Sequence, residues 1–415
     1  MSESYQRIGG AIDSAPIFDV HSHLGTGGQA QARTLADIVS YHWLATDLAC
    51  AAGRRFERDP RKEPEEYLRE VLPYFPAVRN TVNHFALMHI LRDLHGLEDR
   101  TLTERNWERV DRSVREHADD PQWVPSVLDR ANIRKVCTND HDIARDEAGR
   151  YVPYVQAEYL YVPSVAHHLK HIGGPEQALP ETAEGLAAAI EARVARLVEK
   201  KVRVLHVWAP GTWIYRATEP QQIDPLLKRL LAGEKPSKEE RDLFASFCAD
   251  ATAGAAGRHQ LVVQLFHGTL HYAERGPASY WNPEFLRSLT EHFARHRETH
   301  FDLFLSTRIP SHEAVSFSRI FPNLHVSGAW WQGFSPSTLT VFFRDRLEML
   351  PNTAWNAYYS DGYIVEWIYG KLPVTKNRLA HALAAMVDEE LLTLDDALEM
   401  GPQLLYDNAM QIYKP

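Results

Sequence analysis

The chain has few cysteines and lacks long apolar runs. Its 415 residues include three cysteines, Cys50, Cys137 and Cys248, which lie far apart. This spacing fits neither a zinc ribbon nor the disulfide framework of a secreted domain, so a reducing cytoplasm is expected. No apolar run approaches the roughly 18 residues of a membrane span, and the N-terminus lacks the apolar core of a signal peptide. The composition therefore predicts a soluble cytoplasmic protein without a membrane partner.

The chain also lacks a sustained block of basic residues. Its 45 lysines and arginines are scattered among 55 aspartates and glutamates, which gives a net charge of −10. Proteins that bind nucleic acid usually carry a basic patch or stripe. The expected partner is therefore a small polar substrate, and nucleic acid is not expected.

What the chain does have is a pair of histidines, His21 and His23, directly after the apolar stretch Pro16–Val20. Side chains alternate faces along a strand, so two histidines separated by one residue project from the same side and can bind one ion. Barrel enzymes place their catalytic groups at the C-terminal ends of the strands. The pattern favours a metal site after the first strand, and a pair of ordinary surface histidines is the alternative.

Short apolar segments alternate with helical patterns over most of the chain, which indicates parallel strands joined by crossover helices. After the first strand, the expected strands are Arg134–Thr138, Leu160–Val165, Arg203–Trp208, Leu261–His267, Phe301–Thr307, Leu324–Trp330 and Trp355–Asp361. Residues from about 30 to 125 instead carry apolar residues at three- and four-residue intervals, as amphipathic helices do.

We therefore predict an α/β fold, an eight-stranded (β/α)8 TIM barrel. It is expected to form one domain over residues 1–415, with a helical insertion after the first strand at about 30–125. A doubly wound open sheet would show similar alternation. Such a sheet should carry a Gly-rich phosphate turn after an early strand, whereas the early strand here ends in histidines.

Polar residues at the strand ends should meet at one mouth of a barrel. His21 and His23 follow the first expected strand, His267 ends the fifth, and Asp361 ends the eighth. Two or three imidazoles and a carboxylate, with a position left for water, make a catalytic zinc-type site. Asp361 beside the metal could then move protons. The alternatives are a core histidine at position 267 and a helix cap at position 361.

Two other groups of rings have weaker signals. His292 and His296 stand four residues apart among glutamates and arginines, so a solvated helix face is expected there. Trp43, Trp330 and Trp331 could stack on the ring of a sugar, although aromatics near a barrel mouth often serve packing alone.

The motifs together resemble the uronate isomerases of the amidohydrolase superfamily over nearly the whole chain. The likeness is carried by His21–Leu24, Tyr41–Leu44, Cys137–Asp140, Leu231–Glu234, Gln264–His267, Gly328–Trp331 and Leu405–Ala409. The resemblance implies a distorted barrel with one divalent ion, expected to be zinc, held by His21, His23 and Asp361. It implies His267 as a further ligand and, by analogy, a homo-oligomer.

The chain departs from that family where the isomerases have polar groups for the substrate. Tyr363 stands where the family has an arginine, Trp43 follows His42 where the family has a tyrosine, and Leu205 replaces the aspartate of an Asp-His pair at His206. Arginine is the usual partner of a carboxylate because it binds both oxygens at once. These departures favour a less anionic substrate than a uronate.

The residues expected to act in the site follow from this comparison. The candidate catalytic residues are Asp361, His42 and His206. The candidate substrate-binding residues are Trp43, His271, Arg308, Trp330, Trp331 and Tyr363. The favoured hypothesis is hydrolysis of a small polar substrate by metal-activated water. The alternatives are interconversion of the aldose and ketose forms of glucuronate or galacturonate, and a non-catalytic sugar-binding barrel.

Overall fold

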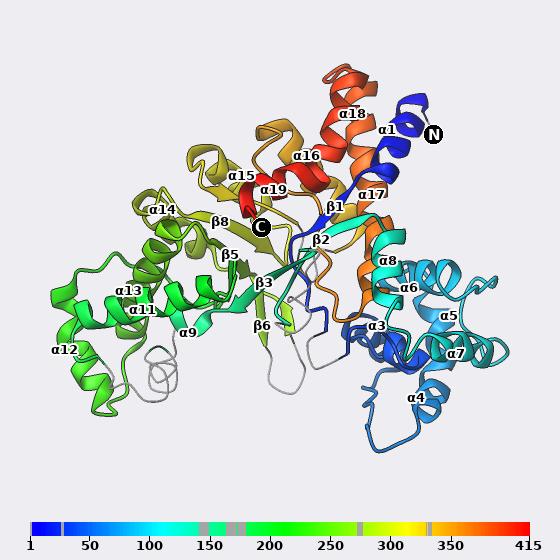
Figure 1. Cartoon of the computed structure of the whole chain (residues 1–415), viewed down its shortest axis with the longest axis horizontal. Coiled ribbons are helices and arrows are strands. Elements are labelled where there is room, and N and C mark those ends of the chain that lie inside the picture. Colours follow the sequence, from blue (N-terminus) through cyan, green and yellow to red (C-terminus); the bar gives the residue numbers. More distant parts are fainter. Residues whose placement is uncertain are drawn as a thin grey trace. The chain divides into compact units, whose positions relative to one another are not determined.

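The computed structural model describes residues 2–25, 29–140, 149–162, 172, 180–271, 277–328, 330 and 334–415. The backbone groups into two compact units, whose elements are labelled in Figure 1. Unit 1 comprises Met1–Tyr151 and Tyr358–Pro402, and unit 2 comprises Val152–Ala357 and Gln403–Pro415. Each unit therefore contains segments that are far apart in the sequence. That the chain folds as one domain stays a prediction.

Unit 1 begins with helix α1 (Glu3–Ser14), which leads into the short strand β1 (Ile17–Asp19). The side chain of Ser2 caps this helix by accepting a hydrogen bond from the backbone N–H of Tyr5. Strand β1 is wholly buried and pairs in parallel with β2 (Ile133–Thr138). The first two expected strands are thus confirmed.

Helices fill the chain between these two strands, as the spacing of apolar residues predicts. They are α2 (Leu35–Val39), α3 (His42–Ala52), α4 (Pro64–Val71), η1 (Leu72–Tyr74), α5 (Phe75–Val78), α6 (Val82–Asp93), α7 (Trp107–Glu116) and α8 (Trp123–Arg130). In α7, Trp107, Val110 and Val114 are buried at the three- and four-residue spacing of one helix face. The apolar faces form a shared core that includes Trp367. The helical insertion is confirmed.

Helix α17 (Val365–Asp388) joins the two segments of unit 1, since it packs against α1, α6, α8 and α18 (Leu394–Pro402). It approaches α6 closely at Gly370, where a Cβ atom would lie 2.6 Å from Cγ1 of Ile90 and 2.8 Å from the carbonyl oxygen of Ala86.

Neither α17 nor any other helix in the described part of the chain has a stretch long and apolar enough to cross a bilayer.

Unit 2 is built on parallel strands that follow one another in the order β3 (Tyr151–Gln156), β4 (Val204–Trp208), β5 (Val262–His267), β8 (His300–Leu305) and β9 (Leu324–His325). The helices of this unit are α9 (Glu158–Tyr161), α11 (Ala183–Glu199), α12 (Pro220–Leu231), α13 (Lys238–Arg258), α14 (Pro283–Arg295), α15 (Ser311–Ile320), α16 (Pro336–Met349), η5 (Gln403–Asp407) and α19 (Asn408–Tyr413). A short antiparallel hairpin, β6 (Thr269–His271) and β7 (Pro277–Ser279), follows β5. Helices lie between successive parallel strands, so the expected alternation is confirmed.

The prediction of a strand at Leu160–Val165 is wrong for the described residues of that range. Leu160 and Tyr161 belong to helix α9, and residues 163–165 lie outside the described residues. The strand of this region is β3, a few residues earlier. Pro153 lies inside β3, and a proline within an apolar run argues against a strand because it cannot donate to the ladder.

The last two expected strands are shorter than predicted or missing. Strand β9 covers only Leu324 and His325, and no strand is assigned within the described residues 355–361. Two features break a regular ladder there. The carboxylate of Asp19 accepts the backbone N–H of Ser360, and Asp361 has a left-handed φ of 53°.

The close approach of α17 to α6 predicts a stability effect. Gly370→Ala should lower the free energy of unfolding by about 1–3 kcal/mol, because the added methyl group would overlap Ile90 and the backbone of Ala86. Gly10→Ala in α1 is the matched control, since a Cβ there meets nothing within 4 Å. Alanine should stabilise that helix by up to about 1 kcal/mol. Urea unfolding followed by circular dichroism measures both, and equal midpoints for the two variants would contradict the overpacking argument.

Candidate functional site

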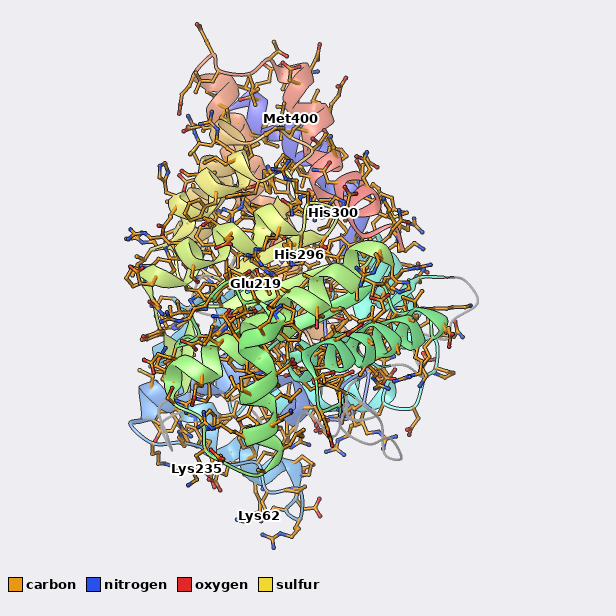
Figure 2. The ribbon with its side chains drawn as sticks, turned by 90° about the vertical axis from the view of Figure 1, so that its left-hand side faces the viewer. Lys62, Glu219, Lys235, His296, His300 and Met400 are labelled. Atoms are coloured by element: carbon orange, nitrogen blue, oxygen red, sulfur yellow. The ribbon has the colours of Figure 1, made fainter. Side chains whose placement is uncertain are left out.

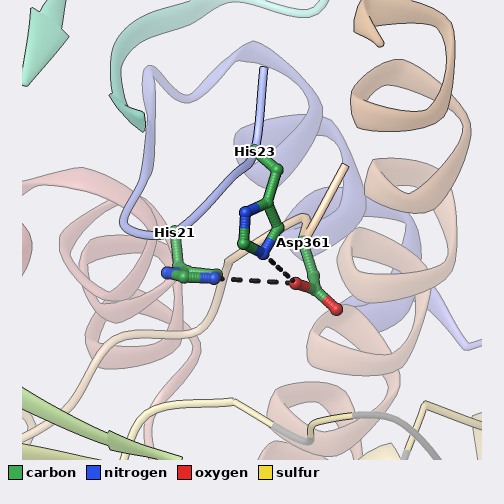
Figure 3. A group of neighbouring side chains, drawn as sticks. All are labelled: His21, His23 and Asp361. Carbon is green, nitrogen blue, oxygen red and sulfur yellow. Dashed lines mark ion pairs between the residues drawn. The ribbon is translucent and has the colours of Figure 1, made fainter. Parts of the chain in front are cut away.

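Unit 1 brings two histidines and one aspartate together at the end of β1 (Figure 3). Nε2 of His23 lies 3.3 Å from Oδ1 of Asp361, and Nε2 of His21 lies 3.6 Å from the same oxygen. The two imidazole rings stand nearly perpendicular, with centroids 5.0 Å apart. His21 and Asp361 are buried, and His23 is half-buried. The sequence prediction that these three residues share one site is consistent with this geometry.

The spacing suits one metal ion. Ligand atoms held at about 2.0–2.1 Å from a tetrahedral zinc ion lie about 3.3 Å from one another. The observed separations of 3.3 and 3.6 Å match this value and exceed those of ordinary hydrogen bonds. Two nitrogens and one carboxylate oxygen also form a common catalytic donor set. His21, His23 and Asp361 therefore fit a divalent ion of the zinc type.

The backbone holds His21, His23 and Asp361 in register. The carbonyl oxygen of His21 accepts hydrogen bonds from the backbone N–H groups of Asp361, at 2.9 Å, and Ser360, at 3.2 Å. The N–H of His23 donates to the carbonyl of Gly362 at 2.8 Å. The segment after β1 thus lies directly beside the segment that precedes α17. The positions of the imidazoles and of the carboxylate are set by this pairing.

Asp361 occupies a strained backbone conformation that a neighbouring tyrosine supports. Its φ of 53° is uncommon for a residue other than glycine, although aspartate tolerates it better than most. The hydroxyl of Tyr41 donates to the carbonyl oxygen of Asp361 at 3.0 Å. Strain of this kind gathers at functional sites, where the surrounding structure must maintain it.

A buried lysine on α17 completes the support. Nζ of Lys371 donates to the hydroxyl of Tyr41 at 2.7 Å and to the carbonyl oxygen of Ser360 at 2.5 Å. Burial lowers the pKa of Lys371 to about 8, against the opposing charges of Asp361 and Asp19. The side chain still carries a positive charge at neutral pH, and it lies next to the segment that presents the metal-type carboxylate.

Two buried carboxylates in this region have pKa values that are shifted in opposite directions. Burial raises the pKa of Asp19 to about 7, although Ser360 and Lys371 partly offset it. Burial acts in the same direction on Asp361, but the interactions with His21 and His23 outweigh it and hold its pKa well below the usual range. Asp361 is therefore ionised at neutral pH, as a metal ligand must be.

Three predicted site residues surround this group within unit 1. The ring of Tyr363 stacks on His23 with centroids 4.7 Å apart. His42 meets the ring of Tyr363 edge-on at 5.7 Å and contacts the ring of Trp43 at 5.0 Å. Tyr363 and His42 are partly exposed, so solvent reaches this side of the site. The candidate catalytic and substrate-binding roles of these residues stay predictions.

The remaining described candidates lie in unit 2. Of these, His267 at the end of β5 is fully buried, and its ring stacks on that of Phe285 at 3.5 Å. Burial lowers the pKa of His267 to about 3, so its imidazole is neutral. A neutral imidazole suits a metal ligand and equally suits a core histidine. Its role as a further ligand stays a prediction.

The other candidates of unit 2 differ in exposure. His206 is buried, with Nδ1 3.4 Å from a carboxylate oxygen of Glu158. Trp330 is buried too, where its ring packs edge-on against Trp208 and Phe266. Arg308 is exposed.

Two candidates fall outside what the structure describes. Trp331 lies outside the described residues, and so does the side chain of His271, whose backbone belongs to β6.

The sequence patterns did not indicate that Lys371 and Asp19 lie beside Asp361, or that Glu158 lies beside His206. Lys371 does leave a signal, because it falls at a core position of the apolar pattern of α17, next to Leu372. A lysine is almost never fully buried unless it is paired. Asp19 and Glu158 leave no comparable pattern, since their partners are distant in the sequence.

Comparison with known proteins supports the fold but extends no further. No protein-family model matches the chain, and no curated protein matches it. Solved structures do match along its whole length. A uronate isomerase from Thermotoga maritima superposes with a TM-score of 0.86 at 14% identity, covering 100% of this chain and 98% of that one. A glucuronate isomerase from Caulobacter crescentus gives 0.83 at 16% identity, with 99% and 94% covered. A proposed metal-dependent hydrolase from Lactobacillus casei gives 0.63 at 13% identity, with 98% and 97% covered.

These similarities show that the chain has the fold of the uronate isomerases. The expected α/β class and the distorted barrel are confirmed. The resemblance carried by the short motifs therefore extends to the three-dimensional fold, while the low identities leave the reaction open.

The support of Asp361 by Tyr41 predicts a change in metal affinity. Tyr41→Phe removes the hydroxyl that donates to Asp361 and accepts from Lys371. Loss of such an outer partner typically weakens metal binding about 10–100-fold. Competition with a coloured chelator measures the affinity for Zn²⁺. Tyr369→Phe in the same unit is the control, because its hydroxyl donates to Asp93 instead. Equal affinities in the two variants would show that Tyr41 does not position the ligand.

Proposed function

We propose that the chain is a divalent-metal-dependent enzyme that hydrolyses a small polar substrate. The observation that carries the proposal is the convergence of His21, His23 and Asp361 at ligand spacing within unit 1. The similarity in fold to a structure that is named a proposed metal-dependent hydrolase supports it. A bound divalent ion would lower the pKa of a coordinated water and polarise a carbonyl group.

Asp361 is the residue proposed to move protons. Its Oδ1 faces the two imidazoles, and Figure 3 shows its second carboxylate oxygen pointing away from both. An ionised carboxylate at this place can accept the proton of an attacking water and return it to the leaving group. Tyr41 and Lys371 hold the backbone of this segment, so the carboxylate stays oriented during the transfer.

The surroundings of the site favour hydrolysis over uronate chemistry. Tyr363, at the position where the isomerases have an arginine, stacks on His23, and burial raises its pKa to about 12. Its hydroxyl is therefore neutral and provides no charge to pair with a substrate carboxylate. Lys371 carries a charge, but it is buried and donates to protein oxygens. We therefore propose a substrate with less negative charge, such as an amide, an ester or a lactone.

A second candidate function is the isomerase reaction itself. It is favoured by the similarity in fold to structures that are named uronate and glucuronate isomerases. In that reaction the ion would hold a carbonyl and the neighbouring hydroxyl of the sugar acid. A non-catalytic sugar-binding barrel is the third candidate. Zinc as the ion, a cytoplasmic location and a homo-oligomeric state stay predictions of the sequence.

A substrate screen with two variants separates these candidates. Metal-loaded protein should hydrolyse at least one member of a panel of small lactones, esters and amides, and it should form no ketose from glucuronate or galacturonate. Asp361→Asn should lower the rate about 100-fold or more, because general acid–base catalysis typically contributes at least that much.

Asp119→Asn is the matched control, since this side chain is 87% exposed and pairs only at the surface with Arg33 in the described structure. Exhaustive chelation should abolish the rate, and added divalent ion should restore it. Ketose formation by wild-type protein would contradict the proposed hydrolysis and support the isomerase reaction. Full activity of chelated protein would rule out both metal-dependent reactions.

A further inference from the structure

Unit 2 contains a second group of metal-type side chains, between α13 and α14. Nδ1 of His292 lies 2.7 Å from Oδ1 of Asp250, and Nε2 of His296 lies 2.9 Å from the same oxygen. The glutamates and arginines around both histidines predict a solvated helix face. That prediction is wrong for His292, which is fully buried.

The local sequence explains why the two imidazoles converge. Residues four apart on a helix lie on the same face, one turn above the other. His292 is in the last turn of α14, and His296 is the residue that caps its C-terminal end. Asp250 comes from the middle of α13, whose first turn starts at Lys238. The ligand atoms of all three residues lie within 4.8 Å of one another.

Two tyrosines surround this group as outer partners surround metal ligands. The hydroxyl of Tyr161 forms a hydrogen bond with Nε2 of His292, the ring nitrogen that faces away from Asp250. The hydroxyl of Tyr215 donates to Oδ1 and Oδ2 of Asp250, at 3.1 and 3.0 Å. Metal-binding histidines and carboxylates usually have such hydrogen-bond partners on their remaining atoms, which fix their orientation.

The group is open to solvent on one side. The side chains of Asp250 and His296 are each 16% exposed, whereas His292 is closed off. His296 is labelled in Figure 2, which looks onto the green helices of unit 2. An ion could therefore enter beside His296, and water could supply a fourth ligand. The guanidinium of Arg295 lies 3.7 Å from Oδ2 of Asp250, on the oxygen that the histidines do not contact.

We propose that Asp250, His292 and His296 form a second site for a divalent transition-metal ion of the zinc type, which ties α13 to α14. Two imidazoles and one carboxylate are the donor set that suits such an ion. The group has no role in the proposed reaction, and the inference does not depend on it. Its role is structural, because an ion there would link two helices across one carboxylate.

Binding requires only small changes at the group. The present separations are those of hydrogen bonds, and ligands around one zinc ion would stand about 3.3 Å apart, so each contact lengthens by a few tenths of an ångström. His296 would bind through Nε2, so its proton must lie on Nδ1. His292 would bind through Nδ1, so its proton must lie on Nε2, where the oxygen of Tyr161 accepts it. No net proton leaves this imidazole.

The test counts bound ions in variants that separate the two sites. His23→Ala removes a ligand of the site in unit 1, and His296→Gln removes a ligand of the second site while it keeps a donor for Asp250. Protein dialysed against Zn²⁺ and then against metal-free buffer is analysed by mass spectrometry. We expect about one bound ion in His23→Ala and about none in the double variant His23→Ala/His296→Gln. His23→Ala/His259→Ala is the control and should keep its ion, because His259 is a partly exposed histidine paired with Glu191.

Two further readouts guard against misfolding. Zn²⁺ should raise the unfolding temperature of His23→Ala and leave that of the double variant unchanged. Co²⁺ bound to His23→Ala should show the visible absorption of a four-coordinate ion. Adding the substitution His296→Gln should remove this absorption. Equal zinc content in His23→Ala and the double variant would overturn the proposal. Failure of the first site would look different, since wild type and His23→Ala would then hold the same number of ions.

Discussion

The pairing of two short backbone segments, residues 19–23 and 360–362, is the constraint on which the candidate site depends. Its hydrogen bonds bring the carbonyl of His21 to the N–H of Asp361 and the N–H of His23 to the carbonyl of Gly362. This pairing restricts the positions that the side chains of His21, His23 and Asp361 can adopt. Small displacements of ligands change metal affinity and reactivity strongly, so a site held by backbone pairing is better defined than one held by flexible loops alone.

Burial of several charges makes this pairing electrostatically demanding. Asp19, Asp361 and Lys371 are all buried within unit 1. A buried charge is costly unless it is paired and hydrogen-bonded. Lys371 offsets part of the negative charge, and Asp19 reduces its own cost because its pKa rises to about 7. Asp361 keeps its charge through the two histidines, which is the arrangement that a divalent cation would stabilise further.

The two groups of metal-type residues differ in how their geometry arises. In unit 1, the three residues come from irregular segments, and Asp361 has a left-handed backbone. In unit 2, Asp250 and His292 come from the regular helices α13 and α14, and His296 is the residue that caps α14, four positions after His292. One side of the first group is exposed to solvent at His42 and Tyr363. In the second group, the buried His292 is hydrogen-bonded to Tyr161, and Asp250 and His296 stay partly exposed.

Much of this organisation was predictable from periodicity alone. The amphipathic spacing in residues such as Trp107, Val110 and Val114 identified the helical insertion, because a helix that buries one face must repeat its apolar residues about every 3.6 positions. The apolar segments at β2, β4, β5 and β8 were identified for a similar reason, since buried parallel strands are continuous apolar runs. Strand β3 was missed because Pro153 interrupts its run. The expected strand Trp355–Asp361 was wrong, because the carboxylate of Asp19 replaces a ladder partner at Ser360.

The sequence by itself determined which chemistry was present: a His-x-His pair after a strand, and a late aspartate that could complete a metal site. Those features are local, since they depend on residue type and on spacing of a few positions. Only the tertiary structure decided that Lys371 and Tyr41 support Asp361, and that His292 is buried beside Asp250 rather than solvated. The reason is physical. Desolvation and hydrogen bonding depend on neighbours that lie tens to hundreds of residues away, and no local pattern records which of them will meet.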